Sequence, residues 1–205
     1  MYPKRLSRRA SLAAVLLVSL SMAGCATTMA PPVVSAAGRF TTATRLTDAQ
    51  AMTTAPFDRA RFGVVYVKYA TGAPAMDRFF LDAVKATGAF DVVLDGEALQ
   101  QRVIATSQAT GGPAVFIDNT AGLFELSKTQ GPFLIVEPSV EYIGGYDYAA
   151  SLRATDASTG KVVFLARHKA FNWAGLDQPL FYPLLNAFID WTHGVPPPAQ
   201  AKRRS

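Results

Sequence analysis

The stretch YDYAASLRATD, residues Tyr146–Asp156, alternates between two kinds of side chain with a period of two. The more apolar set consists of Tyr146, Tyr148, Ala150, Leu152 and Ala154, and the other set of Asp147, Ala149, Ser151, Arg153 and Thr155. Because successive side chains of a strand point to opposite faces, this pattern predicts a strand with one buried face. The turn residues ASTG (157–160) and the stretch KVVFLARHKAF (161–171) predict an antiparallel partner strand.

The segment before this pair, FLIVEPSVEYI (133–143), begins as a continuous apolar run. Such a run is typical of a central strand that is buried on both faces. Pro138 has no N–H to donate to a sheet, so it predicts either a bulge or a change to an edge position there.

Further upstream, FGVVYVKY (62–69) and FDVVL (90–94) are rich in β-branched and aromatic residues, which predicts two strands. Between them, Pro74 suits the first turn of a helix and Gly88 its end. The apolar residues of this segment recur at helical spacing, namely Met76, Phe79, Phe80, Ala83 and Val84.

Two helices are expected between the second strand and the central strand. Asp95 can cap the first of them, which carries the apolar residues Leu99, Val103 and Ile104. Residues 107–119 are predicted to form a loop because they include Gly111-Gly112-Pro113. Asp118 or Asn119 can then cap a short helix that ends at Gly131.

The last predicted helix is LFYPLLNAFIDWTHG (180–194), with Pro183 in its first turn or at a kink and Gly194 at its end. It is apolar on most sides, which suits either deep burial or contact with a neighbouring subunit. All elements together predict a single α/β domain of mixed α+β type. Its order is β-α-β-α-α-β-β-β-α, with the helices packed on a mixed sheet.

The N-terminus has the features of a secretory signal. A basic start precedes an apolar run from Leu12 to Leu20, which is too short for a permanent membrane helix. The next residues resemble the lipobox of bacterial lipoproteins, with Met22, Ala23 and Gly24 before Cys25, the single cysteine of the chain. This resemblance implies cleavage before Cys25, a diacylglycerol on its sulfur and an N-acyl chain. The alternative is an ordinary signal peptide that is cut nearby.

The chain is expected to divide into four parts: a lipoprotein signal peptide (1–24), an acylated cysteine with a flexible tether (25–45), a globular periplasmic α/β domain (46–195) and a disordered basic tail (196–205). The tether is rich in Ala, Thr, Ser and Pro. Of 20 Lys and Arg residues, four lie in the signal and three in the tail, against 15 acidic residues overall. The body therefore has no basic excess, and nucleic-acid binding is not expected.

A catalytic or metal-binding role is not supported by the residue inventory. His168 and His193 have no neighbouring ligand at a spacing such as H-E-x-x-H. The sequence contains neither a G-x-S-x-G motif nor a phosphate-binding glycine loop, and its carboxylates are scattered. We therefore expect no enzyme activity, no metal and no cofactor other than the lipid on Cys25.

Aromatic residues gather at two places that could form an interface. The candidate interface residues are Trp173, Phe171, Phe181, Tyr182 and Tyr146. Aromatic side chains are enriched at protein interfaces, but half of this chain is hydrophobic, so burial in the core is the alternative reading.

Three segments together resemble a superfamily of outer-membrane lipoproteins that includes the curli secretion channel CsgG, the penicillin-binding-protein activator LpoB and the Pel export lipoprotein PelC. The segments are GAFDVVLDGEALQQ (88–101), FLIVEPSVEYIGG (133–145) and YAASLRATDASTGKVVF (148–164). In the last segment the matching positions are Leu152, Asp156, Thr159, Gly160 and Val163. The resemblance covers about residues 60–193.

The resemblance implies a non-catalytic interaction module in envelope biogenesis, anchored in the outer membrane and facing the periplasm. It would act as a component of secretion or export, or as the activator of an envelope enzyme, through a protein partner or as a homo-oligomer. A second class stays open, namely a periplasmic lipoprotein that binds or processes a small solute. One fold hosts unrelated tasks, so the partner is not identified.

Overall fold

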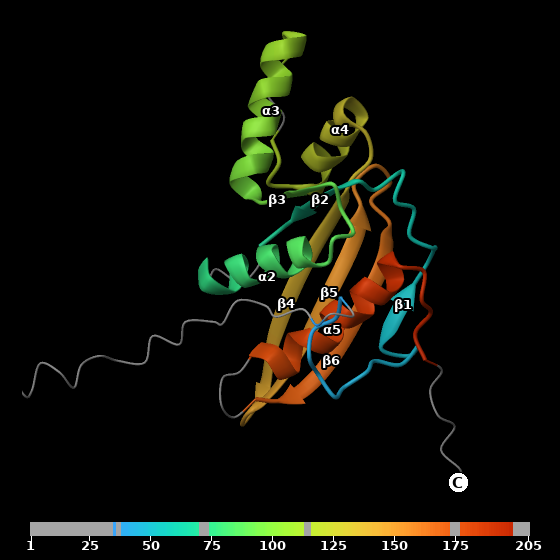
Figure 1. The fold of residues 1–205 in the computed structure, drawn as a ribbon. Helices are drawn as coiled ribbons and strands as arrows, with labels where there is room; N and C mark the ends of the chain where they lie inside the picture. The colour runs from blue at the N-terminus through green and yellow to red at the C-terminus, as the bar shows by residue number, and fades with distance from the viewer. Residues whose placement is uncertain (1–34, 36–37, 70–73, 113–115, 173–176, 199–205) are drawn as a thin grey trace, which may run out of the picture.

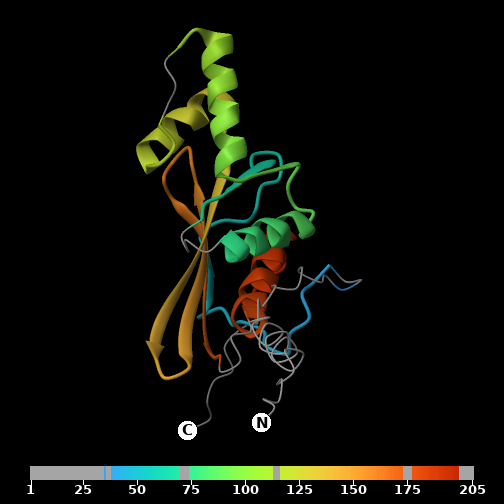
Figure 2. The same ribbon diagram turned by 90° about the vertical axis from the view of Figure 1, so that its left-hand side faces the viewer.

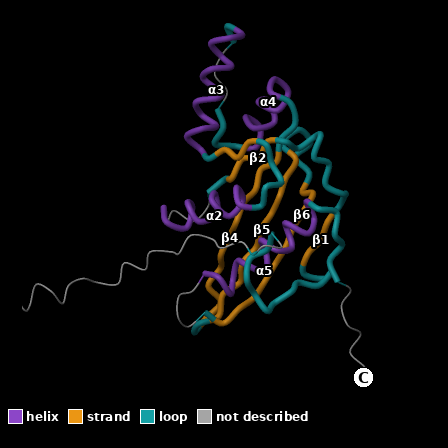
Figure 3. Tube along the Cα trace, viewed as in Figure 1, coloured by secondary structure: helices purple, strands orange, loops and turns teal. Residues whose placement is uncertain are grey.

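The computed structural model describes residues 35, 38–69, 74–112, 116–172 and 177–198. Across these residues six strands form one mixed sheet in the order β1-β6-β5-β4-β2-β3, and four helices pack on it (Figures 1 and 3). The strands are β1 (Ala51–Thr53), β2 (Val64–Val67), β3 (Val92–Leu94), β4 (Leu134–Gly144), β5 (Asp147–Asp156) and β6 (Val162–Phe171). The helices are α2 (Pro74–Ala86), α3 (Gly96–Thr110), α4 (Thr120–Gln130) and α5 (Asp177–Thr192). The predicted α/β class is confirmed.

The two faces of the sheet are covered differently (Figure 2). On the inner face, α2 and α5 pack over Val65, Val67 and the apolar side of β5, which forms the larger core. On the outer face, α3 and α4 cover only one end of the sheet, where Tyr66 and Ile135 pack against Leu99. Strand β2 is thus buried on both faces, as its unbroken apolar sequence requires.

The predicted alternation in β5 is confirmed where the strand lies beneath α5. Ala150, Leu152 and Ala154 are buried, and Arg153 between them is exposed. Tyr146 does not follow the pattern, because it precedes the strand and is 50% exposed.

Pro138 lies within β4, which stays continuous through it and pairs with β5 in regular register. The irregularity in the ladder occurs later, between Tyr142 and Gly144. Strand β2 pairs with β4 only as far as Val136. Of the two predicted alternatives, the change to an edge position is therefore correct and the bulge at Pro138 is wrong.

Several boundaries differ from the predicted ones. Helix α3 continues to Thr110, although 107–119 was expected to be a loop, and Gly111 ends it with φ of 66°. The hydroxyl groups of Thr106 and Thr110 donate hydrogen bonds to carbonyl groups one turn earlier, so the helix itself satisfies them. Asn119, rather than Asp118, caps α4. Pro183 lies inside α5, beyond its first turn, because this helix begins at Asp177.

The segment before the predicted domain boundary at Leu46 also packs on the inner-face core. Phe40 is 2% exposed and its ring lies 5.0 Å from that of Tyr182. The Asn186 side chain accepts a hydrogen bond from Phe40 N (2.8 Å) and donates one to Phe40 O (2.9 Å). Arg39 pairs with the nearly buried carboxylate of Asp190. The folded body therefore includes part of the expected tether.

Strand β1 was not predicted, because three residues carry too little periodicity to recognise. It pairs with β6 in antiparallel fashion, Met52 opposite Leu165. None of the helices within the described ranges is long and apolar enough to cross a bilayer.

Candidate contact surface at the hairpin end

The sheet has one end that no described helix covers. We call it the hairpin end: residues 140–148 of β4 and β5 with their connecting turn, together with Phe171 at the end of β6. Gly144 and Gly145 both adopt positive φ, at 150° and 60°, so the tight turn between β4 and β5 needs glycine there. Beside it, Asn172 N donates to Tyr146 O (2.7 Å) and joins the end of β6 to this turn.

Large apolar side chains gather on the hairpin end. Their exposed fractions are Phe171 65%, Tyr142 61%, Ile143 50%, Tyr146 50% and Val140 41%. The rings of Tyr146 and Phe171 meet edge to face with centroids 5.8 Å apart, and those of Tyr142 and Tyr148 lie 5.4 Å apart. The rings therefore support one another. Tyr142, Tyr146 and Phe171 remain accessible to a partner, whereas Tyr148 is half-buried and packs against the inner-face core.

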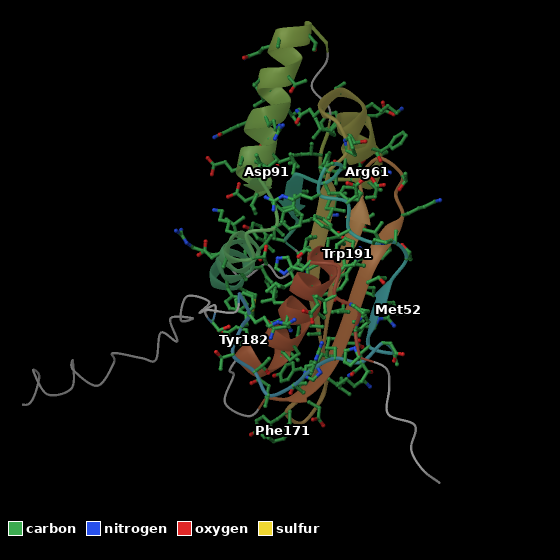
Figure 4. The ribbon with its side chains drawn as sticks, turned by 45° about the vertical axis from the view of Figure 1, so that its right-hand side comes forward. Met52, Arg61, Asp91, Phe171, Tyr182 and Trp191 are labelled. Carbon is green, nitrogen blue, oxygen red and sulfur yellow. The ribbon has the colours of Figure 1, made fainter. Side chains whose placement is uncertain are left out.

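The aromatic residues of α5 have the opposite environment. Phe181 is 0% exposed and Tyr182 is 3% exposed, and both belong to the inner-face core. Figure 4 shows Tyr182 and Trp191 within the body of the molecule and Phe171 at its edge. The prediction of Phe181 and Tyr182 as interface residues is therefore corrected: their rings fill the space between α5, α2 and the sheet.

Of the other predicted site residues, Cys25, its lipobox residues Met22, Ala23 and Gly24, and Trp173 lie outside the described residues. Tyr146 and Phe171 are brought together on the surface and remain interface candidates. Sequence reasoning missed Ile143 and Val140, because both were assigned to a strand expected to be central.

A polar hollow lies beside the hairpin end on the outer face. In one row across the strands, Ser139 and Ser151 share a hydrogen bond of 2.8 Å and Arg167 follows on β6. In the next row, Glu141, Ala149 and Lys169 lie side by side. Because the central residues are small, a shallow hollow of about 740 Å³ opens between the longer charged side chains.

An ion-pair network separates this hollow from the helix-covered end. Glu137 on β4 binds Lys68, the residue just after β2, at 3.2 Å. It also binds Arg153 of β5, whose Nε lies 3.0 Å from Glu137 Oε2. Burial, and then the negative charge of Glu137, raises the pKa of Tyr66 above its ordinary value. These groups hold β2, β4 and β5 together. Because they pair with one another, we do not count them among the groups that could bind a ligand.

The D-x-x-T-G segment that carried the family resemblance has a structural role. The buried carboxylate of Asp156 accepts hydrogen bonds from Ser158 N (2.9 Å) and Thr159 Oγ1 (3.0 Å) and pairs with Arg61 at 2.6 Å. Gly160 has φ of 67° and closes the turn. The motif therefore shapes the β5–β6 turn at the far end from the hairpin end.

In the part of the chain that the structure describes, we find no group of side chains arranged as a catalytic site. No group of three or more His, Cys, Asp or Glu residues there could hold a metal ion. His168 lies half-buried on β6 opposite Ala150, and His193 is exposed just after α5.

No family model and no curated protein matches the sequence. Among solved structures, a PelC dodecamer from Paraburkholderia phytofirmans is similar at 17% identity and a TM-score of 0.40, over 67% of this chain and 95% of that one. The LpoB C-terminal domain from Salmonella enterica is similar at 14% identity and a TM-score of 0.33, over 52% of this chain and 81% of that one. Lipoprotein GNA1162 from Neisseria meningitidis is similar at 13% identity and a TM-score of 0.35, over 55% of this chain and 83% of that one. The chain is therefore similar to these three structures only at low sequence identity.

Proposed function

We propose that this protein is a lipid-anchored module of the cell envelope that works by contact rather than by catalysis. The lipobox supports attachment to the outer membrane through Cys25, with the folded body in the periplasm. A partner in secretion, export or envelope-enzyme activation would bind at the hairpin end.

The observation that carries this proposal is the exposed aromatic cluster of the hairpin end. Large apolar side chains that are exposed next to one another mark interaction sites more often than single exposed residues do. Tyrosine and other aromatic residues also dominate the energy of protein interfaces. The ring pair Tyr146–Phe171 is arranged before any partner arrives, which lowers the entropy that binding must overcome.

The contact region is tested by site-specific crosslinking in intact cells. A photoreactive benzoylphenylalanine replaces Phe171 in one strain and Phe116 in a matched control, because Phe116 is 80% exposed but lies far from the hairpin end, before α4. We expect discrete crosslinked products from position 171 and few from position 116. Equal products from both positions would remove the hairpin end as the contact region.

The anchor is tested separately by the variant Cys25→Ser. The mature native protein is expected to carry diacylglycerol and an N-acyl chain, measured by mass spectrometry, and to fractionate with the outer membrane. The variant should lose both properties. A native protein with an unmodified thiol would contradict the lipoprotein assignment.

A second function is favoured by the outer-face hollow, whose Ser139, Ser151, Arg167 and Lys169 could bind a small polar solute. The oligomeric state of the full-length protein in detergent separates the two functions. A dimer or a larger ring supports the contact module, and a monomer that binds a solute in the hollow supports the alternative.

A further inference from the structure

Strand β4 has an open edge at the hairpin end. Val136 O accepts a hydrogen bond from the N–H of Lys68, the residue just after β2 (2.9 Å), so the backbone groups of Val136 face β2. Backbone groups alternate in direction along a strand, so those of Pro138, Val140 and Tyr142 face the same side. Strand β2 ends at Val67, and no described residue pairs with the outward groups of Val140 or Tyr142.

The residues along this edge are accessible. Val140, Glu141 and Tyr142 are all exposed. An open edge with unpaired N–H and C=O groups is a template for another strand. Pro138 removes one donor at the point where β2 stops, but it leaves the outward amides of Val140 and Tyr142 intact.

The end of β2 shows what chemistry suits a strand in this position. Where β2 lies beside β4, its apolar residues Val65 and Val67 face the inner core, and Lys68 binds Glu137 on the outer face at 3.2 Å. Further along β4 the same order recurs, because Glu141 occupies the outer face and Val140 and Tyr142 the inner face. A strand that continued the line of β2 would therefore need a cation opposite Glu141.

We infer that the open edge of β4 binds an extended segment of a partner protein that alternates apolar and basic residues. Its backbone pairs with Val140 and Tyr142, its apolar side chains cover theirs, and a Lys or Arg pairs with Glu141. This inference rests on the proposed function, because it names the kind of partner that the hairpin end receives. The favourable charge pair distinguishes such a segment from a second copy of β4, which offers no basic residue between Pro138 and Gly144.

The test measures binding of two capped, fluorescently labelled peptides to the full-length protein in detergent, by fluorescence anisotropy. One peptide is Thr-Val-Lys-Val-Lys-Val-Thr and the other replaces both lysines by glutamate. We expect the lysine peptide to bind about fivefold more tightly, since a cross-strand charge pair replaces a repulsion. Equal affinities would overturn the inference.

Two variants locate the site. Val140→Pro removes an outward N–H that β5 does not use and should weaken binding about tenfold or more, whereas the control Val140→Thr keeps the N–H and should bind normally. Glu141→Lys leaves the backbone unchanged and should reverse the preference toward the glutamate peptide. If neither Val140→Pro nor Glu141→Lys changes the affinity for the peptides, the edge of β4 is not the binding site.

Sedimentation of the same samples supplies the remaining outcome. A stable dimer that Val140→Pro dissociates would show that a second copy occupies the edge, and would overturn the inference. If the peptides do not bind but position 171 still crosslinks to partners in cells, the edge inference fails and the proposed function stands.

Discussion

The aromatic residues of α5 and those of the hairpin end are similar in type but opposite in environment. Phe181, Phe188 and Trp191 are buried between α5 and the sheet, whereas Tyr142 and Phe171 are exposed where the sheet extends past its covering helices. Burial thus depends on whether a second layer lies opposite the residue, because an apolar face needs a partner layer to leave water. This contrast separates the residues that hold the fold from those that are free to bind.

The largest expected effect comes from the buried side of the comparison. Phe188 is fully buried, and its ring lies 5.3 Å from Phe164 and 5.7 Å from Trp191. Phe188→Ala should lower the free energy of unfolding by about 3–5 kcal/mol, because it leaves a cavity. Denaturant unfolding followed by circular dichroism measures the loss. A cost below about 1 kcal/mol would mean that α5 does not pack as described.

A smaller loss is expected where the N-terminal segment joins α5. Arg39→Ala removes the partner of the nearly buried Asp190 carboxylate and should cost about 1–3 kcal/mol. Arg45→Ala is the matched control, since Arg45 is exposed on the same segment. The two variants are compared by the same unfolding experiment. Equal stabilities would show that the pair between Arg39 and Asp190 adds nothing to the stability of the folded body.

A tyrosine in the packed half predicts how stability depends on pH. Burial, followed by the charges of Asp95 and other carboxylates, raises the pKa of Tyr69 to about 12. An unfolded tyrosine ionises at about pH 10. Between this pH and the pKa of the folded state, the unfolded chain binds fewer protons than the folded chain. This contribution to stability is therefore complete below pH 10 and is lost as the pH rises toward 12.

The variant Tyr69→Phe isolates this contribution. Unfolding measured at several pH values above 9 should show a shallower decline for the variant than for the native chain, because both share every other titrating group. Parallel declines would indicate that Tyr69 ionises equally easily in both states.

The smallest effect on stability is expected at the exposed side of the comparison. Phe171→Ala should change the free energy of unfolding by no more than about 0.5 kcal/mol, since most of its ring already contacts water. The same variant should reduce capture of envelope partners by the lipidated protein, measured by pull-down after chemical crosslinking. A large loss of stability would place Phe171 with the core residues instead.

Much of the fold could be predicted from local patterns. The alternation in β5, the helical spacing in α2 and the capping role of Asp95 each depend on neighbours within a few residues. Strand β1 escaped prediction because its pairing with β6 is a long-range contact without a local signature. The packing of Phe40 against Tyr182 escaped for the same reason.

The candidate site was only partly predictable. Tyr146 and Phe171 could be named from residue type, but so could Phe181 and Tyr182, which the structure buries. The open edge of β4 had one signal in the sequence, Pro138, whose missing donor is tolerated where no strand follows. The residue at which the pairing of β2 with β4 ends could not be predicted from the sequence of either segment alone.

Local sequence patterns were enough to predict the class of the fold and the order of its elements apart from β1, because these follow from periodicity and turn chemistry. Attachment at Cys25 remains a prediction from a short contiguous motif. Tertiary structure alone decided which aromatic residues are covered and where the sheet edge is open. Those properties depend on the relative lengths and positions of elements far apart in the chain, such as β2, β4 and α5.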